Sequence, residues 1–309
     1  MSADPSLPSD AAAAPRSDMA HPLPCVCLCV DDFGLHAAIN DAVLHLLELG
    51  RIGATGAMVD GPAWTAGAAA LHAQPAGRID VGLHLDLTEA ALASESRAKL
   101  PLRQLIVASY TRRLDPSWLA SEVRRQLDAF ERAWQQPPAF VDGHQHVHQL
   151  PMVREALLDE LLQRYPDPAQ RPWLRDTRPA LGLSAGVANA FKAAVIAALG
   201  RPALRRMATT YGFATNRALS GVYDFQGDGV RYQQLLGAWL LHARHGDVLM
   251  CHPATAMVQG DAIAAARCNE YQVLASEWFG GLLEQLPLRI GPLARWLREA
   301  QQARHGGTA

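Results

Sequence analysis

CVCLCVDDFG, residues 25–34, decides the fold expected for this chain. Six apolar residues predict a buried strand, and two neighbouring carboxylates, Asp31 and Asp32, follow it directly. These adjacent charges repel each other, and burial makes both more costly to ionise. A bound cation would resolve the conflict, so the stretch indicates a metal site at the end of a strand. Because neighbouring residues on an extended strand point to opposite faces, the chain has to turn near this pair, and Phe33–Gly34 is a suitable place.

Short apolar runs alternate with helical periodicity along the rest of the chain. Apolar residues recur at helical spacing from Ile39 until the pattern ends at Gly50. Strand–helix alternation of this kind predicts an α/β fold with parallel strands. The Ala-rich segment 254–266 fits either a mobile loop or a short helix. We expect strands at 25–30, 52–59, 79–88, 173–175 and 246–254, a short strand from Ala139, and helices at 115–135, 151–163 and 186–199.

Composition excludes several classes of protein. A hydrophobic content of 49% with 19% charged residues is enough for a large core. The net charge of −2 gives no electrostatic reason to expect nucleic acid or an anionic membrane as a partner. No uncharged apolar run approaches the ~20 residues of a membrane span. We expect residues 1–22, rich in Ala, Pro and Ser, to be a disordered tail without a secretion signal, and 23–300 to be a single domain.

The cysteine pattern argues against a structural zinc site. Cys25, Cys27 and Cys29 alternate along the first strand and therefore share one of its faces. A zinc ribbon would need a second close pair, and Cys251 and Cys268 do not form one. We interpret the three cysteines as small buried apolar residues. Free thiols make the cytoplasm the default compartment, and the sequence is compatible with a homodimer.

Polar side chains stand where several of the expected strands end. In parallel α/β folds the carboxyl ends of the strands gather ligands and catalytic groups. A carboxylate with two imidazoles suits a divalent metal and leaves positions open for water and substrate. The residues concerned are Asp31, Asp32, His84, His144, His146, His148 and His252.

Each of these features also has an ordinary explanation. An acidic pair after a first strand opens response-regulator receiver domains, but no Asp-then-Lys pair follows at the spacing of that fold. Haloacid dehalogenase phosphatases need Asp-x-Asp, and Phe33 occupies the third position here. A lone His84 is more often a satisfied polar residue, the HQHVH cluster (144–148) fits a solvated loop, and His252 fits a helix cap. Their joint placement at strand ends favours a common site.

Four motifs together carry a family resemblance. They are VDDFG (30–34), VGLHLDLTE (81–89), VDGHQHVH (141–148) and LMCHPA (249–254). In this order and spacing the chain resembles the YdjC/ChbG carbohydrate deacetylase family, which includes the hopanoid-biosynthesis-associated HpnK-type branch. The resemblance implies a distorted (β/α) barrel like that of NodB-type polysaccharide deacetylases. It also implies removal of an acetyl group from an N-acetylated amino sugar, on an oligosaccharide or a glycolipid, with one divalent metal ion.

The resemblance assigns the metal site and the catalytic base. It makes Asp32, His84 and His144 the metal ligands and Asp31 the base. Two imidazoles favour zinc, whereas magnesium prefers oxygen ligands, so both metals stay open.

The remaining assignments lie on the substrate side. His252 would be the general acid or a polar partner of the leaving amine. Arg175 would orient either the substrate or Asp31, and His146 would face the substrate. Two rival functions remain: another barrel metallohydrolase acting on ester or phosphate bonds, and a sugar-binding protein without turnover. A binding protein has no need of both Asp31 and His252, which argues for catalysis.

Overall fold

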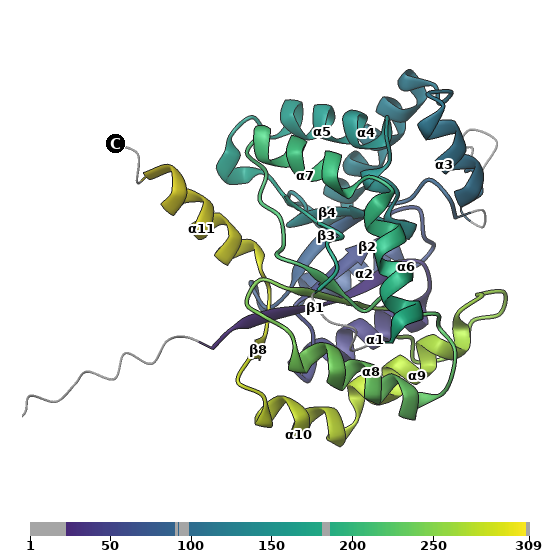
Figure 1. The fold of residues 1–309 in the computed structure, drawn as a ribbon, viewed down its shortest axis with the longest axis vertical. Coiled ribbons are helices and arrows are strands. Elements are labelled where there is room, and N and C mark those ends of the chain that lie inside the picture. The colour runs from purple at the N-terminus through teal and green to yellow at the C-terminus, as the bar shows by residue number, and fades with distance from the viewer. Residues whose placement is uncertain (1–22, 90–91, 93–98, 181–185, 307–309) are drawn as a thin grey trace, which may run out of the picture.

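Parallel strands form one curled sheet, and helices cover it (Figure 1). The computed structural model describes residues 23–89, 92, 99–180 and 186–306. The strands are β1 (Cys25–Phe33), β2 (Ala54–Ala57), β3 (Asp80–Leu85), β4 (Phe140–Gly143), β5 (Trp173–Leu174), β6 (Leu219–Ser220), β7 (Val248–Cys251) and β8 (Arg289–Ile290). Their order in the sheet is β5–β4–β3–β2–β1–β7–β6, with β8 paired to β1, and every pairing is parallel. The predicted parallel α/β fold is confirmed.

Two isolated β-bridges connect the chain around β5 with the chain around β6, the two outer strands of the sheet. Leu174, at the end of β5, bridges to Thr215, and Pro179 bridges to Leu219 of β6. Both bridges are parallel, so the chain closes the gap between the outer strands without a full ladder. The result is the distorted (β/α) barrel that the family resemblance implied.

The four helices predicted from the sequence are present as α1, α4, α5 and α6, and the described residues form seven more. In α4 the side chain of Asp115 accepts a hydrogen bond from the Ser117 N–H at 2.9 Å, and a proline occupies the first turn. The Ala-rich segment resolves into irregular chain up to Ile263 followed by a helix. The helices are α1 (Ala37–Glu48), α2 (Trp64–His72), α3 (Leu102–Tyr110), α4 (Pro116–Trp134), α5 (Val153–Arg164), α6 (Val187–Ala198), α7 (Arg201–Thr210), α8 (Gly229–Leu241), α9 (Ala264–Ala275), α10 (Glu277–Gln285) and α11 (Ala294–Gly306).

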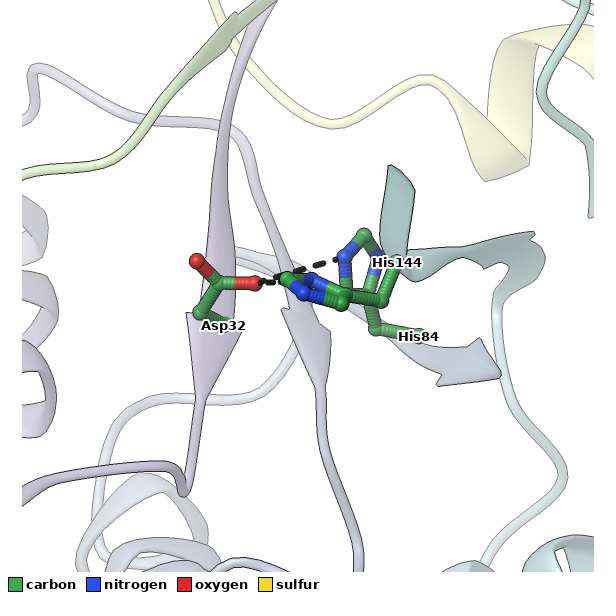
Figure 2. Close-up of side chains that lie close together, drawn as sticks. All are labelled: Asp32, His84 and His144. Atoms are coloured by element: carbon green, nitrogen blue, oxygen red, sulfur yellow. Dashed lines mark hydrogen bonds and ion pairs between the residues drawn. The ribbon is translucent and has the colours of Figure 1, made fainter. Parts of the chain in front are cut away.

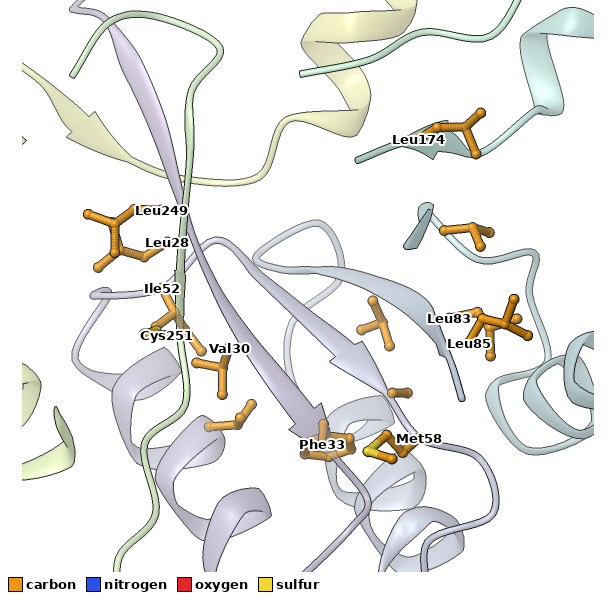
Figure 3. Close-up of a cluster of buried hydrophobic side chains, with 14 of the residues drawn as sticks. Leu28, Val30, Phe33, Ile52, Met58, Leu83, Leu85, Leu174, Leu249 and Cys251 are labelled. Atoms are coloured by element: carbon orange, nitrogen blue, oxygen red, sulfur yellow. The ribbon is translucent and has the colours of Figure 1, made fainter. Parts of the chain in front are cut away.

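β1 lies at the centre of the core, and all nine of its residues are buried. Leu28, Val30 and Phe33 pack with residues of the neighbouring strands and helices, as Figure 3 shows. Cys25, Cys27 and Cys29 belong to a second cluster with Phe140 and Trp173, and each of these cysteines is a free, buried thiol. The interpretation of the cysteines as small apolar residues is confirmed. A central strand buried on both faces reads as a continuous apolar run, as it does here.

The turn at the end of β1 comes one residue earlier than expected. Asp32 itself takes a left-handed backbone conformation, with φ 67°, and the pairing register with β2 shifts between Val30 and Phe33. Asp32 therefore breaks the strict alternation of the strand, and Phe33 still belongs to β1. This local distortion is what allows neighbouring carboxylates to serve one site.

Candidate active site

The predicted site residues gather at the carboxyl ends of the strands. Asp31 and Asp32 end β1, His84 lies on β3, His144 follows β4, and His252 follows β7. All five line one pocket with a volume of about 650 Å³. This edge is where parallel barrels bind their ligands.

Asp32, His84 and His144 converge on one point. Nδ1 of His144 lies 3.0 Å from Oδ1 of Asp32, and Nε2 of His84 lies 3.4 Å from the same oxygen (Figure 2). One ligand atom from each residue lies within 4.8 Å of the others. A carboxylate oxygen and two imidazole nitrogens at this separation form a donor set that fits a divalent ion.

A second carboxylate fixes the ring of His84. Nδ1 of His84 lies 2.7 Å from Oδ1 of Asp142, so a proton on Nδ1 leaves the lone pair of Nε2 facing Asp32. Burial alone would lower the pKa of His84, but the carboxylates of Asp142 and Asp31 raise it well above its usual value. Gly56 of β2 backs the ring, where an added Cβ would come within 3.2 Å of it. The negative field around His84 favours a cation.

Arg175 binds Asp31 in a fully buried, two-point contact. Its two terminal nitrogens lie 2.7 Å from the two carboxylate oxygens of Asp31, and its Nε lies 2.7 Å from Oδ2 of Asp142. Burial raises the pKa of Asp31, but Arg175, His84 and His252 together lower it more, and the net pKa lies below the ordinary value. The side chain of Arg175 is 0% exposed and contacts carboxylates, not the pocket. One guanidinium thus fixes both Asp31 and the carboxylate that orients His84.

Arg267, on α9, binds the outer oxygen of Asp32 and was not predicted from the sequence. Its terminal nitrogen lies 2.6 Å from Oδ2 of Asp32, and its Nε lies 2.6 Å from Asp261. Burial raises the pKa of Asp32, yet Arg267 and His144 hold it well below the usual range. Because Arg267 takes Oδ2, the other oxygen of Asp32 is the one directed at the two histidines.

His252 stands on the other side of Asp31. Its Nε2 lies 3.9 Å from Oδ2 of Asp31, and its ring meets the ring of Phe225 edge-on at 5.2 Å. Burial lowers the pKa of His252 to about 4, although Asp32 and Asp31 act in the opposite direction. The imidazole is therefore neutral near pH 7.

Glu270 of α9 anchors the backbone of His252 and was also missed in the sequence. Its carboxylate accepts hydrogen bonds from the His252 N–H and, at 2.7 Å, from the hydroxyl of Tyr223. Burial raises the pKa of Glu270 to about 7. No motif marks it, because it reaches the site only through the packing of α9.

The HQHVH cluster is a tight turn and not a solvated loop. Gln145 and His146 have positive φ angles of 52° and 61°, so successive histidines point in different directions. His146 lines the pocket, and its buried Nδ1 has no hydrogen-bond partner among the described residues. His148 is buried, with Nε2 2.9 Å from the carbonyl oxygen of Arg175. The cluster therefore gives the pocket His144 and His146 and gives the core His148.

Apolar side chains form much of the remaining pocket wall. Such apolar walls with a few polar groups are typical of small-molecule sites. The apolar lining residues are Leu35, Leu102, Ile106, Leu150, Ile196, Leu199, Val222, Tyr223, Phe225, Met250 and Ile263.

Fold and site together define a (β/α) barrel protein with a carboxylate–histidine centre suited to a divalent ion. A family model described as YdjC-like protein matches residues 25–285. The chain belongs to the YdjC-like protein family.

Two curated relatives and one solved structure illustrate the likeness. The chitooligosaccharide deacetylase of Serratia marcescens is 30% identical over 128 residues, 40% of this chain and 50% of that protein. The carbohydrate deacetylase of Homo sapiens is 28% identical over 149 residues, 44% of each chain. The chain thus spans about half the length of the curated relatives it matches. A candidate cellobiose-phosphate cleavage protein from Enterococcus faecalis V583 superposes on 89% of this chain and 99% of its own, with a TM-score of 0.60 and 16% identity, which shows a shared fold.

Proposed function

We propose that this protein is a metal-dependent hydrolase that removes the acetyl group from an N-acetylated amino sugar, carried by an oligosaccharide or a glycolipid. The observation that carries the proposal is the placement of Asp31, held by Arg175, beside the convergent set of Asp32, His84 and His144. The names of the two curated relatives support it. We also propose a cytoplasmic location, and a homodimer is compatible with the sequence.

In this proposal Asp32, His84 and His144 hold one divalent ion, zinc or magnesium. When bound, the ion supplies a Lewis acid for the amide carbonyl and lowers the pKa of a water molecule. Asp142 holds the ring of His84, and Arg267 holds Asp32, so the three ligands keep their orientation before an ion arrives.

Asp31 accepts the proton of the attacking water. The low pKa of Asp31 makes this carboxylate a weak base. The same low pKa keeps Asp31 ionised near neutral pH, so it is ready to accept a proton. Arg175 fixes the direction of its oxygens. Of the two roles that the sequence left open for Arg175, orientation of Asp31 is therefore the one we propose.

His252 delivers a proton to the leaving amine. Because its pKa of about 4 makes it neutral near pH 7, it must first take up a proton, and Asp31 is 3.9 Å away. Once Asp31 holds the proton from water, it can pass that proton to His252, which donates it to the departing nitrogen. His146 faces the same pocket and contacts the sugar.

Acetate release tests the proposal. Purified protein, with its metal content measured, is incubated with N-acetylated chitooligosaccharides and N-acetylated glycolipids. Release of acetate supports deacetylation. Hydrolysis of ester or phosphate substrates alone would instead identify another metallohydrolase, and sugar binding without turnover would identify a binding protein.

Two neighbouring substitutions test the assigned roles. Asp31→Asn keeps the shape but cannot take a proton, so kcat should fall by ~10²–10⁴ at every metal concentration while metal still binds. Asp32→Asn weakens an anionic ligand, so metal affinity should fall and added metal should restore part of the activity. Calorimetric metal titration with kcat decides between them. Rescue of Asp31→Asn by metal, without rescue of Asp32→Asn, would show that the two roles are reversed.

A further inference from the structure

Helix α6 carries apolar side chains on both its inner and its outer side and yet remains largely exposed. Its inner side contributes Ile196 to the pocket wall, and Leu199 follows directly after the helix. Its outer side carries Val187, Phe191 and Val195, which are 73%, 70% and 42% exposed. These three lie four residues apart and so form one stripe along the helix. An exposed apolar stripe on a helix whose other side lines the pocket calls for an occupant.

The C-terminal end of α3 extends this apolar surface. The hydroxyl of Tyr110 donates a hydrogen bond to the Leu199 carbonyl at 2.8 Å, which joins α3 to the end of α6. Tyr110 is 50% exposed and Val107, on the same helix, is 61% exposed. We call Val107, Tyr110, Val187, Phe191 and Val195 the α6 face. Exposed large apolar side chains that gather on one surface mark an interaction site.

The surroundings of the α6 face are basic, although the chain as a whole is not. Residues 177–223 hold six lysines and arginines and no aspartate or glutamate, whereas the net charge of the chain is −2. On α7, Arg201 and Arg205 share a single carboxylate, that of Asp176, and Arg206 is exposed. Helix α7, which contacts α6, therefore has more positive than negative charge beside the apolar stripe.

We propose that the α6 face docks on the surface of an anionic lipid bilayer. Apolar side chains enter the boundary between headgroups and acyl chains, and the arginines of α7 meet the lipid phosphates. Among the described residues no single helix could cross a membrane; α6 and α7 together have the length and composition, but they are bent by 50°. Leu204 and Ala208 of α7 are buried in the fold, so this pair lies on the membrane and does not span it.

Charge argues against a second copy of the chain as the occupant. A two-fold contact through this face would bring like patches together, so the arginines of both α7 helices would repel each other. Lipid headgroups supply the opposite charge. Since the inner side of α6 lines the pocket, docking would also bring the mouth of the pocket next to the lipid surface.

Vesicle flotation with purified full-length protein tests the docking. The protein is mixed with phosphatidylcholine vesicles, with or without phosphatidylglycerol, at low and high salt. We expect binding to the anionic vesicles that weakens in salt. Phe191→Ser with Val195→Ser should weaken it by at least about tenfold, because two anchoring side chains are lost. The matched control, Val230→Ser with Leu241→Ser on α8, changes side chains that are 60% and 69% exposed and should leave binding unchanged.

Three results would overturn the proposal: no binding to anionic vesicles, equal binding to neutral vesicles, or equal loss in both pairs of variants. If the protein forms a dimer in solution, the Phe191/Val195 variant is monomeric and neither binds vesicles, the face would be assigned to self-association.

The docking does not depend on the proposed reaction. Acetate release from soluble chitooligosaccharides should be the same in the variant as in the unmodified protein, so failure of either proposal can be recognised separately.

Discussion

Glu270 should make the stability of this protein depend on pH in a way that one substitution removes. Its carboxyl group is fully buried, and burial raises its pKa from 4.5 to about 7. Below pH 4.5 the group is protonated in both the folded and the unfolded chain. Between about pH 4.5 and 7 the unfolded chain loses the proton while the folded chain keeps it, so folding stability falls as the pH rises. Above pH 7 the buried carboxylate is charged, and its full cost remains.

The magnitude follows from the difference in pKa. A difference of about 2.5, between about 7 and 4.5, corresponds to about 3 kcal/mol of unfolding free energy. Glu270→Gln cannot titrate, and its amide oxygen can still accept the hydrogen bond from the His252 N–H. The difference in unfolding free energy, variant minus unmodified protein, should therefore be about 3 kcal/mol larger at pH 8 than at pH 4.5.

Urea unfolding at a series of pH values measures this difference. Other titrating groups are common to both proteins and cancel in the comparison. Glu284→Gln, an exposed site on α10, is the control and should give a curve parallel to that of the unmodified protein. A Glu270→Gln curve that is also parallel across this range would refute the linkage, because it would mean that Glu270 does not change its protonation there.

Three further predictions concern the site itself. Arg175→Met leaves Asp31 buried without its cation, so urea unfolding should show a loss of about 3–5 kcal/mol, more than Arg175→Lys. Asp142→Asn removes the anion that orients His84, so calorimetric zinc affinity should fall by about 10–100-fold, and unchanged affinity would exclude that role. His252→Ala should lower kcat by ~10²–10⁴ with little change in metal affinity, and full activity would exclude it as the acid.

Much of the fold follows from local patterns in the sequence. The run at 25–30 predicts a buried strand because a strand covered on both faces carries apolar residues without alternation. The helix predicted at 115–135 is α4, since its cap, its apolar spacing and the following prolines all mark the same ends. The strand ends locate the polar site residues on one edge, because parallel strands share one carboxyl end. These signals are short-range, which is why sequence alone provides them.

Other features depend on tertiary packing and leave no local mark. Arg267 and Glu270 lie on a helix whose own pattern is unremarkable, and they reach Asp32 and His252 only through the packing of α9 against α1 and α8. The residue that makes the turn is equally hidden, since the sequence requires a turn near Asp31 and Asp32 but favours Phe33–Gly34, whereas Asp32 itself takes the left-handed conformation. A sequence motif indicates which residues share a site. It does not indicate which residues hold them in position.

The adjacent carboxylates of β1 show the difference most clearly. The sequence suggests one cation for the pair, whereas the structure gives each carboxylate its own arginine. Arg175 binds Asp31 from 144 residues away, and Arg267 binds Asp32 from 235 residues away. With Asp142 included, three buried carboxylates face two buried guanidinium groups, and one of these, Arg267, also binds Asp261, so the cluster stays net negative while its histidines are neutral.

That remaining charge lies where the two histidines converge. A buried, unbalanced charge is costly, and the cluster can offset it either by protonating an imidazole or by binding a cation between Asp32, His84 and His144. Burial lowers the pKa values of His84 and His144, but the neighbouring carboxylates raise them overall, which favours the first response. A divalent cation would displace that proton and use the same lone pairs. The arginines therefore fix the geometry of the pair, and the charge that they leave uncompensated is what favours a metal ion.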